Sequence, residues 1–267
     1  LEFRRVLFRS KVNHTVKVGD VCPYKEPNVT EDCIFYADGE PIGFYLSKMP
    51  ENMCKLADLA NAEFKSKNVP KQKMLRQNTD GYDEVLKKYK YKDKVVQLST
   101  IIGSIPPAAQ RGRPYANLHS NHRVKSAATF IKAMIMLGTE AEKLIQEYLP
   151  KQYERQLEIY KGTSKKWMLT NMFTSSISNY NISAGFHIDS KNAKNTVNVI
   201  ICKKLNAQGG DLHVPDYDAT IGQQDNSILV YPAWRNIHGV TPITPTHEDG
   251  YRNSLVFYPL RAFVDMQ

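Results

Sequence analysis

The sequence predicts an α+β fold: a jelly-roll core, or double-stranded β-helix, in the C-terminal half, with helices from the N-terminal half packed on it. From Trp167 onward, short β-branched or aromatic runs alternate with Gly, Pro, Asn and Asp turns, and several short strands at this spacing favour a sandwich or barrel. Before Trp167, apolar residues recur at helical spacing. With 267 residues and 42% hydrophobic content, the chain can bury a core that such helices would cover.

Three helices are expected in the N-terminal half. Residues 11–48 come first and are expected to be irregular or to form short strands, with a turn at DGEP (38–41). Apolar residues then lie at helical spacing in 51–68. A stretch rich in Pro, Gly and Arg (101–123) is typical of a loop, and the helical pattern resumes in a long and a shorter segment, 124–149 and 151–162.

The C-terminal half contains the runs that predict the strands of the jelly roll. They are WMLTNMFTSSI (167–177), TVNVIIC (196–202), GGDLHVP (209–215), SILVYP (227–232) and NSLVFYP (253–259). No repeat or linker interrupts the chain, so 11–267 are expected to form a single domain, helix-rich over 11–166 and with the jelly-roll core over 167–262. The first residues, LEFRRVLFRS (1–10), lack the order of a signal peptide and resemble a cloning or assembly remnant.

The composition argues against several classes of protein. No apolar run approaches the roughly 20 residues that a membrane-spanning helix needs, so no membrane partner is expected. The four cysteines lack CxxC spacing, which disfavours both structural zinc and a disulfide framework. We therefore expect an intracellular protein, cytoplasmic or, in a eukaryote, nuclear.

The charge of the chain favours a polyanionic partner. Lysine and arginine number 36 against 27 acidic residues, a formal net charge of +9, which is typical of proteins that bind nucleic acid. A basic soluble surface without such a partner explains the charge equally well. Lysine alternates with tyrosine in LKKYKYKDK (86–94), which fits either a patch facing nucleic acid or a solvated helix end.

Three residues form a candidate metal site. His187 and Asp189 lie two residues apart in an extended segment, so their side chains point to the same face. His238 follows an apolar run and opens another expected strand, which makes it the third candidate ligand. Two histidines and one carboxylate, with the remaining positions open, form the facial triad of non-haem iron(II) oxygenases.

A candidate anion site follows the last metal ligand. An oxo-acid cosubstrate of such an iron needs a fixed cation for its far carboxylate. Arg252 stands at the start of an expected strand with Ser254 on the same face, and a guanidinium fork with a hydroxyl matches a carboxylate. A zinc hydrolase could use the same three metal ligands, but it would leave Arg252 and Ser254 without a role.

The order of these features resembles the Fe(II)/2-oxoglutarate dioxygenase superfamily. Within it, the chain resembles the branch of the ten-eleven translocation (TET) and J-binding proteins, which oxidises the 5-methyl group of pyrimidines in nucleic acid. The similarity covers roughly residues 167–262, and the first 166 residues show none. Four motifs carry it: HIDSKN (187–192) as H-x-D-x-x-N, LHVPDY (212–217), HGVTP (238–242) and RNSLVFY (252–258) as R-x-S-L-V-F-Y.

By position, the resemblance implies the residues that hold the cofactors. Iron(II) would be bound by the triad and the distal carboxylate of 2-oxoglutarate by the arginine and serine: His187, Asp189, His238, Arg252 and Ser254. Dioxygen is the second cosubstrate that this chemistry implies.

The resemblance also implies further contacts to the cosubstrate and the substrate. His213 would be a cosubstrate contact, and Asn179 occupies another position beside the cosubstrate. Asn192 would hydrogen-bond a flipped pyrimidine and Tyr258 would stack on it. The chain departs from the animal enzymes at Leu260, where they have a histidine that touches the cytosine, and it has no counterpart of their cysteine-rich zinc region. Base recognition is therefore expected to differ in detail.

The function that the resemblance implies is oxidation of a base. The chain would be a monomeric dioxygenase that acts on DNA containing 5-methylcytosine, flips the base out of the stack and hydroxylates it to 5-hydroxymethylcytosine, with further oxidation left open. Alternatives are a thymine or RNA base, a small molecule or a protein side chain as substrate, and a catalytically silent DNA-binding module. Arg111 or Arg113 could supply a further contact, to the cosubstrate or to a phosphate.

Overall fold

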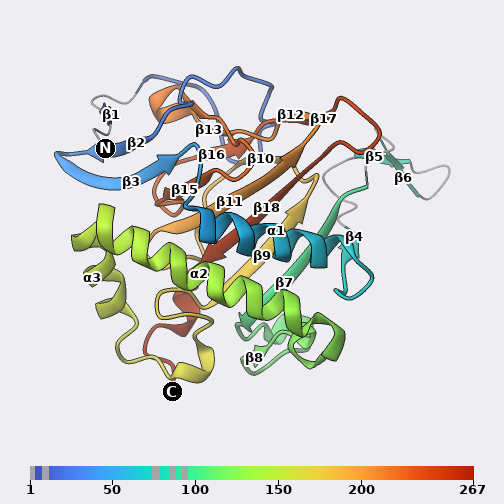
Figure 1. Cartoon of the computed structure of the whole chain (residues 1–267), viewed down its shortest axis with the longest axis vertical. Helices are drawn as coiled ribbons and strands as arrows, with labels where there is room; N and C mark the ends of the chain where they lie inside the picture. The colour runs from blue at the N-terminus through green and yellow to red at the C-terminus, as the bar shows by residue number, and fades with distance from the viewer. Residues whose placement is uncertain (1–3, 8–11, 74–78, 84–87, 92–95) are drawn as a thin grey trace.

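The protein is built around a ten-stranded sheet (Figure 1). The structure, a computed structural model, describes residues 4–7, 12–73, 79–83, 88–91 and 96–267. The middle of the sheet consists of β15 (Ile228–Tyr231), β11 (Asn198–Leu205), β18 (Tyr251–Tyr258), β9 (Ser175–Tyr180) and β7 (Leu98–Ile105), in this order. All neighbours among them are antiparallel.

Strands from the N-terminal half extend this sheet at both edges. β3 (Glu40–Leu46) pairs with β15, and beyond it lie β2 (Cys33–Ala37) and β1 (Arg4–Leu7). At the other edge, β7 pairs with β4 (Gln72–Lys73) and with β8 (Asn117–Leu118). The hairpin of β2 and β3 turns at Asp38 and Gly39, both at positive φ, which confirms the turn predicted at DGEP.

A second, four-stranded sheet packs against one face of the large sheet. Its order is β10 (Ala184–His187), β16 (His238–Val240), β13 (Leu212–Val214) and β14 (Ala219–Ile221). Apolar side chains of both sheets meet in one buried cluster, among them Leu212 and Ile221 of the small sheet and Leu229 and Tyr231 of the large one. Two ribbons complete the strands: β12 (Ala207–Gly209) with β17 (Ile243–Pro245), and β5 (Thr79–Asp83) with β6 (Lys88–Tyr91).

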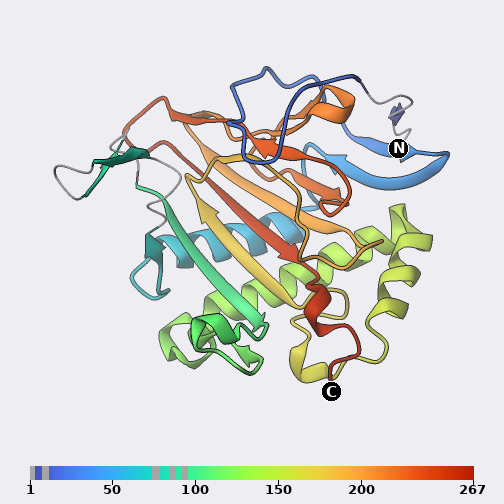
Figure 2. The same ribbon diagram turned by 180° about the vertical axis from the view of Figure 1, so that it is seen from behind.

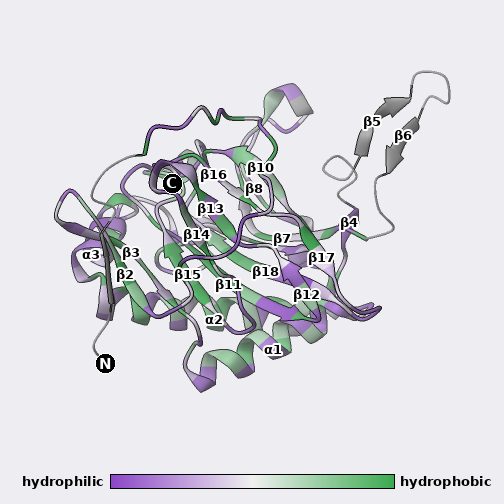
Figure 3. Cartoon of the chain, turned by 90° about the horizontal axis from the view of Figure 1, so that it is seen from above, coloured by the Kyte–Doolittle hydropathy of each residue, from purple (hydrophilic) through white to green (hydrophobic). Residues whose placement is uncertain are grey.

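The helices cover the opposite face of the large sheet (Figures 1 and 2). They are α1 (Glu51–Lys65), α2 (Ala128–Tyr148) and α3 (Pro150–Ile159). Phe64 of α1 and Phe130 of α2 belong to the main hydrophobic cluster together with Leu255 and Phe257 of β18. Hydrophilic and hydrophobic residues alternate along α1 in Figure 3, as expected for a helix with one buried face. Short 3₁₀ turns occur at 109–111, 120–123, 125–127, 165–167, 215–217 and 261–263.

The observed fold confirms the predicted class and corrects several of its parts. A jelly-roll core with N-terminal helices on one face is present. The predicted loop over 101–123 is wrong at its start, because β7 is an interior strand of the large sheet. Its largely buried residues directly precede Pro106 and Pro107, where the Pro-, Gly- and Arg-rich stretch begins to leave the strand. The first predicted strand (167–177) also begins too early, since only its last part, from Ser175 onward, belongs to β9.

Three further expectations meet the structure only in part. The lysine–tyrosine run of 86–94 has a described backbone only over β6, and its side chains lie outside the described residues. Residues 1–10 include β1, which pairs parallel to β2, while their origin stays a prediction. Among the helices of the described residues, none has the length and apolar character needed to cross a membrane.

Candidate metal centre

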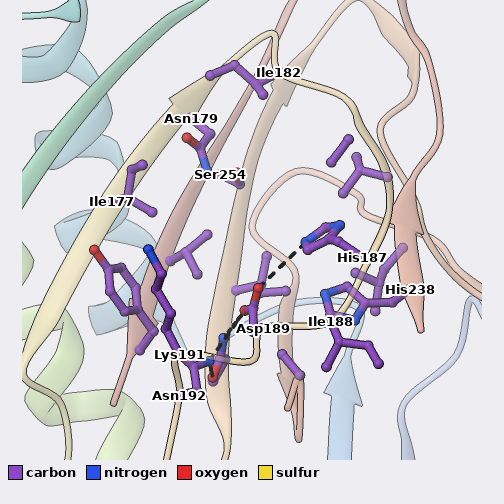
Figure 4. Close-up of a pocket in the computed structure, with 18 of the residues that line it drawn as sticks. Ile177, Asn179, Ile182, His187, Ile188, Asp189, Lys191, Asn192, His238 and Ser254 are labelled. Atoms are coloured by element: carbon purple, nitrogen blue, oxygen red, sulfur yellow. Dashed lines mark hydrogen bonds and ion pairs between the residues drawn. The ribbon is translucent and has the colours of Figure 1, made fainter. Parts of the chain in front are cut away.

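A pocket of about 450 Å³ opens between the two sheets. The large sheet contributes the residues of β18 and β9 that point away from the helices, and the small sheet contributes residues of β10, β16 and β13 (Figure 4). Alternation along β18 explains the division, because Leu255 and Phe257 pack on the helices while Ser254 and Val256 line the pocket.

The small sheet brings the three predicted metal ligands together. His187 ends β10 and lies directly opposite His238, the first residue of β16, in the antiparallel pairing. Their ring centroids are 4.4 Å apart, and His187 Nε2 is 3.6 Å from Asp189 Oδ1. One donor atom from each of the three residues lies within 4.8 Å of the others. The spacing predicted for His187 and Asp189 therefore produces a shared site, with the third ligand supplied by the neighbouring strand.

Hydrogen bonds orient both imidazoles toward this shared point. His187 Nδ1 lies 2.8 Å from the carbonyl oxygen of Gly185, and His238 Nδ1 lies 3.0 Å from that of Asn236. A carbonyl only accepts, so Nδ1 donates in each ring and Nε2 keeps its lone pair for a metal. Burial, and secondly the adjacent His187, lower the pKa of His238, which favours the neutral form that ligates.

Two asparagine amides fix the carboxylate of Asp189. Asn198 Nδ2 donates to Asp189 Oδ2 at 3.0 Å and Asn192 Nδ2 donates to the same oxygen at 3.3 Å. Asn192 Nδ2 also donates to Asn198 Oδ1 at 2.8 Å. Both bonds to Asp189 fall on Oδ2, so Oδ1 is left facing the histidines. Sequence reasoning missed Asn198, although a polar residue inside the apolar run TVNVIIC was the available signal.

The donor set fits a ferrous ion. Two imidazole nitrogens and one carboxylate oxygen on one side, with an open pocket on the other, are the arrangement of a facial triad. Each ligand is held by a neighbouring group, as in established metal sites. A closed structural zinc site would need a fourth protein ligand, and among the described residues the cluster contains three.

The opposite wall of the pocket holds the predicted anion site. Arg252 and Ser254 of β18 both line the pocket, and Asn179 of β9 is the register partner of Ser254. Figure 4 shows Asn179 and Ser254 across the pocket from His187 and His238. Arg252 is only 3% exposed, its Nε has no hydrogen-bond partner, and it forms no ion pair with a carboxylate of the described chain.

Gly210 creates the space for this arginine. A Cβ on Gly210 would collide with Cδ and Nε of Arg252, and the residue has a φ of +75°. Both facts call for glycine, because other residues rarely adopt this conformation. A buried guanidinium without a counter-charge is costly unless an anion joins it. The wall therefore fits the carboxylate of an oxo-acid.

Of the remaining predicted site residues, some line the pocket and others do not. Asn192 and Tyr258 line the pocket, as does Leu260. Burial raises the pKa of Tyr258 well above its usual value, so its phenol is neutral.

His213 does not reach the pocket. Leu212 lines it, and successive side chains of a strand alternate between faces. The His213 ring instead lies within 3.0 Å of Thr220 Oγ1 and packs on Phe186.

The two arginines considered for a further contact lie in the loop after β7. Arg113 is not among the residues that line the pocket, and the side chain of Arg111 lies outside the described part of the chain.

Solved structures are similar to this chain to different degrees. One is described as NgTET1 in complex with 5mC DNA: it has a TM-score of 0.61 and 13% sequence identity, and the match covers 99% of this chain and 87% of that one. Another is a 2OG-Fe(II) family oxidoreductase from Burkholderia pseudomallei, with a TM-score of 0.47, 14% identity and coverage of 82% and 88%. No curated protein matches the sequence.

A family match extends the similarity beyond the motifs. Residues 110–261 match Tet_JBP, described as the oxygenase domain of the 2OGFeDO superfamily. The match begins well before the residue 167 that the motifs indicated, so it includes α2 and α3. The chain therefore belongs to the Tet_JBP family of 2-oxoglutarate- and iron(II)-dependent dioxygenases.

Proposed function

We propose that this dioxygenase hydroxylates the 5-methyl group of 5-methylcytosine in DNA. The observation that carries the proposal is one pocket with the candidate metal triad on one wall and, on the other, a buried Arg252 that pairs with no carboxylate of the described chain. The similar NgTET1 structure is a complex with 5mC DNA, which motivates the choice of substrate.

The protein's residues divide the work between binding and positioning. His187, Asp189 and His238 would hold iron(II) through Nε2, Oδ1 and Nε2. Arg252 would donate to the distal carboxylate of 2-oxoglutarate, and Ser254 and Asn179 would border that carboxylate from the same wall. Iron(II), with 2-oxoglutarate and dioxygen, supplies the oxidant that hydroxylates the methyl group.

Asn192 supports cytosine rather than thymine as the base. Its amide nitrogen already donates to Asn198 and Asp189, so its carbonyl oxygen is the atom that remains for a ligand. That oxygen accepts hydrogen bonds only. Cytosine presents an exocyclic amine beside its 5-methyl group, whereas thymine presents a carbonyl at that position. With thymine, the carbonyl oxygen of Asn192 would face the carbonyl oxygen of the base, and two acceptors cannot form a hydrogen bond.

The location of the pocket requires the target base to flip out of the DNA double helix. The metal ligands lie between two sheets, so a methyl group in a stacked base cannot approach them. Flipping the base costs a few kcal/mol, which stacking on the neutral ring of Tyr258 and the Asn192 hydrogen bond offset.

The test is nucleoside mass spectrometry after incubation of methylated DNA with the protein, iron(II) and 2-oxoglutarate. We expect 5-hydroxymethylcytosine that depends on both additions and is absent with Asp189→Ala. The same digest reports thymine oxidation, and 5-hydroxymethyluracil as the main product would overturn the cytosine assignment. Succinate without a modified base would point to a small-molecule or protein substrate. Products only from methylated RNA would replace DNA as the substrate.

A further inference from the structure

A second hollow of about 740 Å³ adjoins the metal pocket. One side is the loop after β7, from Pro106 to Arg113, and the other comprises Lys191 and the segment from Leu260 to Ala262. Lys191 and Leu260 line both hollows. Material bound in the second hollow would therefore lie directly beside a base bound in the first.

The charged side chains around this hollow are all basic. Arg113, Lys191 and Arg261 line it, and no carboxylate does so among the described residues. Lys191 and Arg261 are exposed and Arg113 is half-buried. Within the described chain, none of the three forms an ion pair. The hollow therefore presents a positive surface that is free to meet an anion.

Backbone pairing holds these cations in place. Arg261 N donates to the carbonyl oxygen of Lys191 at 2.9 Å, next to the bridge between Asn192 and Leu260. Across the hollow, Ala108 and Arg113 form a second antiparallel bridge. Arg113 Nε donates to the carbonyl oxygen of Pro106 at 2.9 Å, which leaves its two terminal amino groups for a ligand.

We propose that this hollow binds the phosphodiester backbone of the strand that carries the target base. The inference rests on the proposed function, because a flipped nucleotide stays joined to phosphates on both sides. Phosphates next to a base in the metal pocket would reach the residues that the two hollows share, and Arg113 and Arg261 would bind them from either side. Arg113 lines this hollow and not the metal pocket, so of its two expected contacts the phosphate is the one that fits.

The test compares two variants that lose the same charge. Arg113→Gln with Arg261→Gln removes two cations from the hollow but none from the metal pocket. Lys55→Gln with Lys132→Gln removes two exposed cations from α1 and α2, on the other face of the large sheet. Binding of a methylated DNA duplex is measured by fluorescence anisotropy at several salt concentrations, with anaerobic, iron-loaded protein. Thermal unfolding checks that all variants fold.

We expect the hollow variant to bind DNA about ten-fold more weakly and its salt slope to fall by about 2, one per lost phosphate contact. The helix variant should stay within about two-fold of the wild type. Equal losses in both would mean that only net charge matters, and unchanged binding in both would also overturn the inference. If the wild type oxidises methylcytosine while the hollow variant binds DNA normally, the inference fails and the proposed function stands. If the wild type binds DNA through the hollow but oxidises no base, the proposed function fails instead.

Discussion

The candidate metal ligands on one wall of the pocket and the arginine on the other differ in how completely their polar atoms are satisfied. On the small-sheet wall, both histidines donate to backbone carbonyls and Asp189 accepts from two asparagines. On the large-sheet wall, the buried Arg252 has an Nε without a partner and, among the described residues, forms no ion pair with a carboxylate. The three candidate metal ligands are thus held by hydrogen bonds before any ligand arrives, whereas Arg252 has no partner for its Nε.

This difference suggests what each wall does. Hydrogen-bonded ligands keep their geometry and need only the metal. An uncompensated buried cation destabilises the folded state until an anion pairs with it. The buried charge of Arg252 therefore lowers the stability of the ligand-free protein. Binding of 2-oxoglutarate to the folded state should raise the melting temperature by mass action.

Asp189→Ala should have the largest effect, because it removes one of three metal ligands. We expect metal binding and turnover to be lost while the melting temperature of the metal-free protein stays within a few degrees or rises, since the carboxylate is partly exposed and serves the metal. Metal analysis of the purified protein and a thermal melt check this. Asp218→Ala, at an exposed carboxylate outside the pocket, is the control. A variant that unfolds would show that Asp189 is structural.

Arg252→Met should separate the two walls. The substitution keeps much of the side-chain volume and removes the cation, so the loss of charge-assisted hydrogen bonds should raise KM for 2-oxoglutarate about 100-fold. Iron affinity should change little, and the melting temperature without ligands should rise, because an unpaired buried charge is gone. Steady-state kinetics and melts measure both. A large loss of iron affinity would contradict the separate roles of the walls.

Asn198→Ala tests the hydrogen bond that supports Asp189 on the small-sheet wall. Loss of the amide that orients Asp189 should weaken iron binding by about 10-fold or more, with KM for 2-oxoglutarate nearly unchanged at saturating iron. Asn192→Ala is the matched variant, since it removes the second amide on the same oxygen. It should also raise KM for DNA, an effect that Asn198→Ala lacks. An equal rise in KM for DNA in the two variants would show that Asn192 does not contact the base.

Gly210→Ala should have the smallest effect and should change only the large-sheet wall, where Arg252 lies. The added methyl group would displace the stem of Arg252, so KM for 2-oxoglutarate should rise several-fold with iron affinity unchanged. Gly39→Ala is the control: it has a similar φ of +80° and no heavy atom within 4 Å of an added Cβ. Kinetics on both variants separate backbone strain, which they share, from the contact with Arg252. The same rise in KM for both would refute the contact.

The convergence of the three candidate metal ligands could be predicted from the sequence because its signals are local. His187 and Asp189 lie on one short extended segment, and His238 opens a strand after an apolar run. The alternation of β18 likewise placed Arg252 and Ser254 on one face. These inferences depend only on spacing within single strands.

The parts that sequence reasoning missed depend on contacts between distant segments. All three residues of β13 are buried, so no alternation in exposure shows that Leu212, rather than His213, faces the pocket. The support from Asn198 arises only when β11 passes behind Asp189. Interior pairing of β7 was hidden by the Pro-rich loop that follows it, and its partner β9 lies far along the chain.

A crystal structure of the protein with iron(II) and 2-oxoglutarate, prepared without oxygen, tests the account most directly. We predict one metal ion bound by His187, Asp189 and His238, and a diacid that spans the pocket from that ion to the guanidinium of Arg252. A metal held by other residues, or a diacid whose far carboxylate leaves Arg252 unpaired, would contradict the account.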